Sequence, residues 1–284
     1  MEDKSCSGRD AGGQMRIAVF QGPQQGGDPA RNLNLLERSA RQAAAAGARL
    51  LVCPEMFLTG YAIGPAAVAA RAEPVDGPSA ARAAGIARAT GVALLYGYPE
   101  RGGDGRVYNA AQLVDRDGRR LANHRKTHLF GTLDRDAFAP GQGPPTLAEV
   151  DGLKLGVLIC YDVEFPENVR LLALQGAALV AVPTANMAPY TFVCRALVPA
   201  RAYENHLFLA YANRCGHEDE LEYLGQSCIV GPDGTDLARA GPGEEMILAD
   251  VDPARIADWS RNNPYLADRR PELYGGLATP GQPA

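Results

Sequence analysis

Three side chains that could together attack a carbonyl carbon lie far apart in the sequence, at Glu55, Lys126 and Cys160. A free thiol has a pKa of about 8.5, so near neutral pH it is mostly protonated and attacks a carbonyl carbon poorly. A carboxylate can take the thiol proton as a general base, and an ammonium can stabilise the negative oxygen formed by the attack. The set therefore supplies a nucleophile, a base and an oxyanion partner, and it needs no histidine.

Each of these residues follows or ends a segment whose pattern predicts a β-strand. Residues 50–53 and 155–159 are unbroken apolar runs, which are typical of strands buried on both faces. Residues 121–126 follow a turn signal. Open α/β sheets place their chemistry beyond the carboxyl ends of the strands, so adjacent strands would bring the three groups together. Taken alone, the cysteine also fits a core position and the two charged residues fit a solvated surface.

Strands and helices alternate through the rest of the chain. We predict further strands at residues 16–20, 92–98, 107–114, 179–182, 207–211, 227–230 and 246–251, and helices at residues 29–46, 78–90, 166–175 and 190–205, the last interrupted near Pro199. No linker, low-complexity stretch or repeat of about 20–50 residues divides the chain. The pattern predicts one α/β domain with two sheets sandwiched between helices. A polar leader at residues 1–14, disordered or foreign to the native protein, precedes it.

Composition and charge exclude several classes of function. With 28 basic and 33 acidic residues the net charge is −5, and no basic patch predicts a nucleic-acid partner. No apolar run of about 18 residues predicts a membrane span, and the leader lacks the apolar stretch of a signal peptide. The six cysteines are scattered and none forms a C-x-x-C pair. We therefore expect reduced thiols in a cytoplasmic protein, with no metal and no other cofactor.

Three blocks of sequence around the same residues resemble the catalytic blocks of the nitrilase superfamily of carbon–nitrogen hydrolases. They are Cys53-Pro54-Glu55, Arg125-Lys126-Thr127-His128-Leu129 and Cys160-Tyr161-Asp162-Val163-Glu164-Phe165-Pro166-Glu167. The blocks stand in the correct order, which is more specific than any single motif. Within the superfamily the chain is most similar to bacterial amidases, such as those of 5-aminovaleramide and those that act stereoselectively on amino acid amides.

The resemblance implies a mechanism for the three residues. Cys160 would attack the amide carbon, with Glu55 as general base and Lys126 as the cation beside the developing oxyanion. The backbone N–H of Tyr161 would be the second oxyanion donor. Ammonia would leave, and water activated by the glutamate would cleave the thioester.

The resemblance also implies a fold and an oligomeric state. The fold is a four-layer α-β-β-α sandwich in one carbon–nitrogen hydrolase domain over residues 15–284, paired through helices into a homodimer. The loosely patterned C-terminal extension at residues 264–284 is expected to take part in that interface.

The chain departs from the family pattern at one carboxylate. Many members carry a second glutamate ahead of a Phe-x-Pro-Gly segment, and here Asp134 stands in its place. A shorter carboxylate could still position Lys126 or the substrate, so its role is open.

Residues near the substrate are less well defined by the sequence. Tyr61 and Asn186 either line the pocket or satisfy loop backbone, and His128 fits a core or wall position better than a Cys-His pair. The acidic loop at residues 218–222 suits a solvated face. As an alternative, Glu222 would receive the ammonium of an ω-amino amide.

We therefore expect an amidase that hydrolyses a small linear carboxamide to a carboxylate and ammonia. The substrate would be an ω-amino amide, such as 5-aminovaleramide, or an amino acid amide. Three alternatives remain: an acyltransferase in which an amine captures the thioester, a nitrilase, and a non-catalytic ligand-binding protein of the same fold. Signatures of serine hydrolases, zinc proteases, P-loop proteins and dinucleotide-binding proteins are absent from the sequence.

Overall fold

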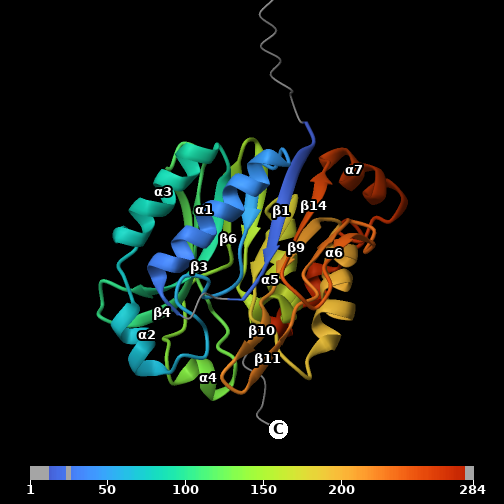
Figure 1. Cartoon of the computed structure of the whole chain (residues 1–284). Helices are drawn as coiled ribbons and strands as arrows, with labels where there is room; N and C mark the ends of the chain where they lie inside the picture. The colour runs from blue at the N-terminus through green and yellow to red at the C-terminus, as the bar shows by residue number, and fades with distance from the viewer. Residues whose placement is uncertain (1–12, 24–26, 279–284) are drawn as a thin grey trace, which may run out of the picture.

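Two six-stranded β-sheets form the centre of the computed structural model, which describes residues 13–23 and 27–278 (Figure 1). The first contains β1 (Met15–Gln21), β2 (Leu50–Val52), β3 (Ala93–Arg101), β4 (Val107–Val114), β5 (Arg120–Arg125) and β14 (Glu245–Val251), in the order β14-β1-β2-β3-β4-β5. The second contains β6 (Thr146–Val150), β7 (Leu153–Val157), β8 (Leu179–Pro183), β9 (Phe208–Ala212), β12 (Cys228–Val230) and β13 (Asp236–Arg239), in the order β13-β12-β9-β8-β7-β6. Each sheet has three adjacent parallel strands, flanked by antiparallel ones.

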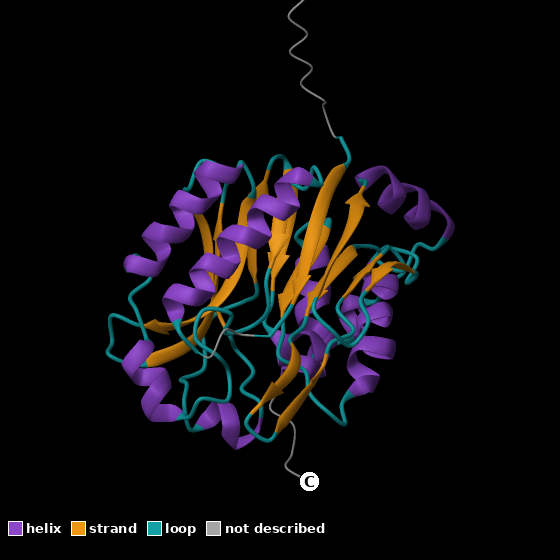
Figure 2. Ribbon diagram, in the orientation of Figure 1, coloured by secondary structure: helices purple, strands orange, loops and turns teal. Residues whose placement is uncertain are grey.

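The two sheets pack face to face, and helices cover the outer face of each (Figure 2). The cluster of buried side chains between the sheets includes Ile17 and Leu95 from the first and Leu155 and Phe208 from the second. The first sheet packs against α1 (Pro29–Ala45) and α3 (Pro78–Thr90), and the second packs against α5 (Pro166–Leu174) and α6 (Val198–Asn205). The four-layer α-β-β-α sandwich predicted from the resemblance is thus confirmed.

The strand predicted at residues 155–159 begins and ends two residues earlier in the structure, as β7 (Leu153–Val157). β7 ends at Val157, and Cys160 opens a short 3₁₀-helix, η1 (Cys160–Glu164). The cysteine therefore lies in the first turn of a helix and not at the end of an extended strand.

The helix predicted at residues 190–205 also differs. A π-helical turn, η2 (Val193–Leu197), leads directly into α6, and Pro199 causes no interruption. Pro199 lies in the first turn of α6, where a backbone N–H donor is not needed within the helix.

Several elements are not predicted by the sequence pattern. They include α2 (Pro65–Arg71), α4 (Gly131–Arg135), the hairpin of β10 (Cys215–Glu218) and β11 (Leu221–Leu224), the edge strand β13, and α7 (Pro253–Asn262). Helices of five to seven residues are too short to show a helical period. The hairpin takes the place of the predicted acidic loop, so that prediction is wrong in its local structure. In Figure 1, α2, α4 and the hairpin lie together at the lower end of the molecule.

The two ends of the chain are only partly described. Of the predicted leader at residues 1–14, only Gly13 and Gln14 fall within the described residues. The C-terminal extension is described as far as residue 278 and forms two short turns, η3 (Pro271–Leu273) and η4 (Gly275–Ala278). The side chains of Leu273 and Leu277 are mostly exposed, so the described part of this segment leaves apolar groups on the surface.

Candidate active site

Lys126 lies between two carboxylates in the interior of the protein. Its Nζ atom is 2.8 Å from Glu55 Oε1 and 2.7 Å from Asp134 Oδ2, and all three side chains are fully buried. The structure therefore brings together Glu55 and Lys126, as the sequence predicts, and adds Asp134 to the pair. One ammonium between two carboxylates makes a compact charged cluster that burial shields from water.

The carbonyl and amide groups around Glu55 fix its position beyond the end of β2. The Glu55 N–H donates to the Thr184 carbonyl at 3.3 Å, which joins the first sheet to the second. Arg214 donates from Nε to the Glu55 carbonyl (3.0 Å) and from Nη2 to the Met56 carbonyl (2.6 Å). Gly97 on β3 allows this backbone to approach, because a Cβ atom there would lie 2.3 Å from the Met56 nitrogen.

One oxygen of the Glu55 carboxylate accepts two hydrogen bonds, and the other accepts none within the described residues. Asn109 Nδ2 donates to Oε1 at 2.7 Å, beside the bond from Lys126. Oε2 is buried and has no partner within the described residues. Burial raises the pKa of Glu55, with a further contribution from Asp134, while Lys126 and Asn109 oppose the shift. A carboxylate with a raised pKa and a free oxygen is suited to general-base chemistry.

Lys126 stays an ammonium despite its burial. Burial lowers the pKa of this amine, but the neighbouring Glu55, Tyr61 and Asp134 outweigh that effect and hold the pKa well above its usual value. The group is therefore a fixed positive charge over the whole range in which an enzyme works.

Cys160 sits at the start of η1 with a backbone φ of 46°, in the left-handed region. Such a conformation costs a residue other than glycine about 1–3 kcal/mol and is concentrated at functional sites. The residue is partly exposed. Burial of the thiol and the Glu55 carboxylate raise its pKa well above the usual value, whereas Lys126 and the Ala185 backbone lower it. The balance of these interactions with Glu55 and Lys126 keeps the thiol protonated at rest.

Tyr161 follows the thiol in the first turn of η1. Its backbone N–H has no acceptor among the described residues, as is usual for the first donors of a helix. Its ring contacts Phe130 and Phe165 edge-on, with centroids 5.5 and 5.0 Å away, and Phe130 in turn contacts Tyr190. A half-exposed aromatic group thus lies beside the thiol.

Asp162 joins the loop that carries Lys126 to the turn that carries the thiol. Its buried carboxylate accepts six hydrogen bonds: from the N–H of Ile159, Thr127 and His128, from the Thr127 hydroxyl, and from His124 Nε2 and His128 Nδ1. Burial raises the pKa of this carboxyl, but the bonds from the two histidines and Thr127 outweigh that effect and lower it. His128 is thereby a wall residue bonded to a carboxylate, as the sequence favoured over a Cys-His pair.

The other predicted residues occupy different surroundings. Tyr61 is buried, its hydroxyl donates to Asp134 Oδ1 at 2.8 Å, and its ring lies 5.6 Å from Lys126 Nζ. Asn186 bonds loop backbone, with its Nδ2 donating to the Tyr190 carbonyl at 3.1 Å. Glu222 is exposed on β11, on the strand face opposite to the buried Tyr223. The structure does not bring Glu222 to the cluster around Lys126.

Several residues of the site are missed by sequence reasoning. Glu218 is buried and accepts the N–H groups of Tyr61 and Ala62 at 2.9–3.1 Å, so it holds the loop that presents Tyr61. Sequence reasoning also misses Asn109, which bonds Glu55, and Asp162, which joins the two loops of the site. A polar Asn109 within the apolar strand at residues 107–114 was the available signal, since buried polar groups need partners. Glu218 gave no such signal among its acidic neighbours.

Within residues 13–23 and 27–278, no three His, Cys, Asp or Glu side chains are grouped as metal ligands. In the same part of the chain, no helix has the length and apolar character needed to cross a lipid bilayer. The five cysteines in this part are all unpaired.

Comparison with known proteins identifies the family. The carbon–nitrogen hydrolase family matches residues 16–261, most of the chain. This chain belongs to the carbon–nitrogen hydrolases of the nitrilase superfamily. A Pseudomonas protegens protein described as "Hydrolase in pqqF 5'region" is 54% identical over 93% of this chain and 92% of the relative. An (R)-stereoselective amidase of a Pseudomonas species is 38% identical over 92% of this chain and 93% of the relative.

Solved structures of the superfamily agree with this assignment. The amidase from Nesterenkonia sp. AN1, in a double mutant bound to acrylamide, has a TM-score of 0.84 at 39% identity, covering 93% of this chain and 97% of that one. Another mutant of that amidase carries the acetamide moiety of fluoroacetamide on its active-site cysteine, with a TM-score of 0.80 at 38% identity and the same coverage. This carbon–nitrogen hydrolase is an amidase, acting on carbon–nitrogen bonds other than peptide bonds.

Proposed function

We propose that this amidase hydrolyses a small linear carboxamide through a thioester on Cys160. Glu55 takes the thiol proton as the sulfur attacks the amide carbon. The carbonyl oxygen becomes an oxyanion that the Lys126 ammonium and the Tyr161 N–H stabilise. The proton passes from Glu55 to the leaving nitrogen, the carbon–nitrogen bond breaks, and ammonia departs.

The second half of the reaction regenerates the enzyme. Water gives a proton to Glu55 and its oxygen attacks the thioester carbon, where Lys126 again faces the oxyanion. The carbon–sulfur bond breaks, the proton returns to the sulfur, and the carboxylic acid leaves. The observation that best supports this proposal is the 2.8 Å contact of Lys126 with a buried Glu55 whose second oxygen is open, beside a protonated thiol.

We propose that Asp134 positions Lys126 in place of the second glutamate of other family members. Its Oδ2 contacts Nζ and accepts the Phe130 N–H at 2.8 Å, while its Oδ1 accepts the Tyr61 hydroxyl. Both carboxylate oxygens of Asp134 are therefore engaged by protein groups. We infer that Asp134 restrains the ammonium and does not exchange protons with the substrate. Asp134→Asn should therefore slow the reaction. Because the Asp134 carboxylate also contributes to the raised pKa of Cys160, the same variant should shift thiol ionisation to lower pH.

The proposed substrates are amides of short acyl groups, including ω-amino amides and amino acid amides. Support comes from the relatives, one named as an (R)-stereoselective amidase and another solved with acrylamide and with butyramide. In this chain the aromatic group of Phe130, Tyr161 and Tyr190 borders the thiol and suits the carbon chain of such an acyl group. Tyr61 and Asn186 border the same region, the first against Asp134 and the second against loop backbone.

An ammonia-release screen over aliphatic, ω-amino and amino acid amides tests the proposal, with Cys160→Ala as the control. We expect turnover of at least one amide class by the native chain and none by the variant. Retained wild-type activity in Cys160→Ala would end the proposed mechanism. The same assay separates the alternatives: an acyltransferase makes an amide or hydroxamate when an amine is added, a nitrilase releases ammonia from the nitrile, and a binding protein releases none.

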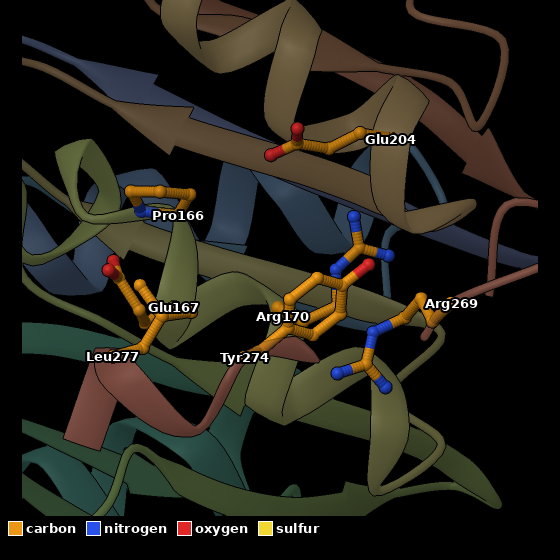
Figure 3. A pocket seen from close by; sticks show the side chains of 7 residues that line it. All are labelled: Pro166, Glu167, Arg170, Glu204, Arg269, Tyr274 and Leu277. Carbon is orange, nitrogen blue, oxygen red and sulfur yellow. The ribbon is translucent and has the colours of Figure 1, made fainter. Parts of the chain in front are cut away.

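We further propose that the chain forms a homodimer through α5 and the C-terminal segment, and that it works in the cytoplasm with its thiols reduced. α5 exposes Leu171 and Leu174, and the C-terminal segment exposes Leu273 and Leu277. Between them, the groove shown in Figure 3 has a volume of about 300 Å³. It is lined by Pro166, Glu167, Arg170, Glu204, Arg269, Tyr274 and Leu277. Light scattering of the native chain and of Leu171→Glu measures the mass: a dimer reduced to a monomer supports the interface, and a native monomer excludes it.

A further inference from the structure

Glu164 is a half-buried carboxylate at the end of η1, four residues after the thiol. Its backbone is fixed, because Arg201 donates from Nη2 to the Glu164 carbonyl at 2.7 Å and from Nε to the Val163 carbonyl at 3.1 Å. The carboxylate itself makes no hydrogen bond or close ion pair within the described residues. The Arg201 side chain is occupied by those carbonyls and by Glu204, so within the described residues it makes no direct ion pair with the Glu164 carboxylate.

The charge of Glu164 reaches the interior of the site. Burial raises the pKa of this carboxyl, and the nearby Lys126 and Arg201 oppose the shift. Tyr211, buried in the second sheet, interacts electrostatically with both the Cys160 thiol and Glu164. The carboxylate and the thiol therefore act on the same enclosed region. A 3₁₀-helix rises about 2 Å per residue, so the step from Cys160 to Glu164 spans about 8 Å, within the reach of a short acyl chain.

The other acidic groups near the site are already engaged or face solvent. Glu55 and Asp134 bind Lys126, Asp162 accepts six hydrogen bonds, and Glu218 holds the backbone of the Tyr61 loop. Exposed carboxylates, such as that of Glu222, are solvated. Glu164 is the one carboxylate of this group that is half-buried and still has no hydrogen-bonding partner within the described residues.

We propose that Glu164 binds a cationic group on the acyl side chain of the substrate, so that the enzyme prefers amides carrying an ammonium. This inference rests on the amidase function proposed above and deepens it. A partly buried charge is costly without a partner, and a substrate ammonium would supply a charge-assisted hydrogen bond at the moment of binding. An uncharged acyl chain would leave the carboxylate unpaired.

The test compares matched pairs of amides that differ only in an ammonium or a methyl group. Suitable pairs are glycinamide and propionamide, 4-aminobutyramide and valeramide, and 5-aminovaleramide and hexanamide. We expect the native enzyme to favour the cationic member of at least one pair in kcat/KM, and the chain length of the best pair locates the ammonium. Glu164→Gln should reduce that preference by about 10- to 100-fold, the usual value of one charged hydrogen bond.

Two further variants make the result specific. Glu164→Lys should move the preference toward an amide with a terminal carboxylate, such as the monoamide of glutaric acid. Glu167→Gln, an exposed carboxylate three residues along the chain, should keep the native preference. An unchanged ratio in Glu164→Gln, an equal loss for both members of every pair, or the same shift in Glu222→Gln would overturn the inference.

A measurement of binding without turnover separates this inference from the proposed function. Calorimetry with the Cys160→Ala protein measures the Kd of each amide without turnover. If the native chain hydrolyses no amide, the proposed function fails, yet a cation preference in Kd that Glu164→Gln abolishes still supports the subsite. If the native chain hydrolyses amides and neither kcat/KM nor Kd depends on Glu164, the subsite fails alone.

Discussion

Replacing Glu55 by Gln should nearly abolish turnover while making the thiol easier to alkylate. The amide oxygen of Gln can still accept the bonds that Lys126 and Asn109 donate to Glu55 Oε1, at 2.8 and 2.7 Å. Its nitrogen takes the place of Oε2, which is buried and without a partner in the described part of the chain. An amide cannot take up the thiol proton, so we expect kcat/KM to fall by about 10²–10⁴.

The same substitution removes a negative charge that acts on the thiol. Burial and the Glu55 carboxylate raise the pKa of Cys160, and Lys126 lowers it. With a neutral residue at position 55 the ammonium remains, so the pKa of Cys160 falls and thiolate forms at lower pH. The midpoint of the pH profile for alkylation by iodoacetamide should therefore move down from its wild-type position.

Two measurements and one control decide this prediction. Ammonia release gives kcat/KM, and mass spectrometry of the intact protein gives the alkylation rate at each pH. Cys160→Ala identifies the alkylated site, because the other four described cysteines are buried. The reasoning is refuted if Glu55→Gln keeps more than about a tenth of the wild-type kcat/KM, or if its alkylation midpoint equals or exceeds that of the wild type.

Three further substitutions have defined outcomes. Lys126→Arg should lower kcat by about 10²–10³, because the planar fork does not fit between Glu55 and Asp134 and an oxyanion donor is lost; steady-state kinetics with a small amide measures this, and near-native kcat contradicts it. Asp162→Asn should destabilise the fold by about 3–5 kcal/mol at neutral pH. Because the pKa of Asp162 is depressed on folding, its stabilisation is fully present above the ordinary aspartate pKa of about 4 and declines as the pH falls from there toward the lower pKa of the folded state. Denaturant unfolding at pH 7 and pH 3 should show a smaller difference between variant and native chain at pH 3. Gly97→Ala should displace the Glu55 backbone and cost about 1–3 kcal/mol, whereas Gly103→Ala, with open space around it, should leave Tm and kcat nearly unchanged.

Local patterns were sufficient for the framework of this fold. The apolar runs before Glu55 and Cys160 predict strand ends, and the charged and nucleophilic residues at those ends predict where the chemistry lies. The Asp28 cap is an equally local signal: its carboxylate accepts the Ala30 N–H at 2.9 Å, at the predicted start of α1. Signals of this kind depend only on neighbouring residues in the sequence, so they can be recognised without the folded structure.

Contacts between distant segments could not be predicted in the same way. Glu218 bonds the backbone of Tyr61, and Asp162 bonds a loop more than 30 residues earlier in the chain. Nothing in the sequence around either residue distinguishes a buried acceptor from a solvated charge. The acidic segment illustrates the consequence: the sequence offered Glu222 as the substrate contact, whereas the structure buries Glu218 and exposes Glu222.

The reacting groups are divided between the two halves of the sandwich. Glu55 and Lys126 follow strands of the first sheet, whereas Cys160 follows a strand of the second. Sliding one half against the other by a fraction of a bond length would alter the approach of sulfur to base without unfolding either half. Catalytic rate should therefore respond to small volume changes at Leu155 or Phe208, in the core between the two sheets against which Cys160 packs, before melting curves register any loss.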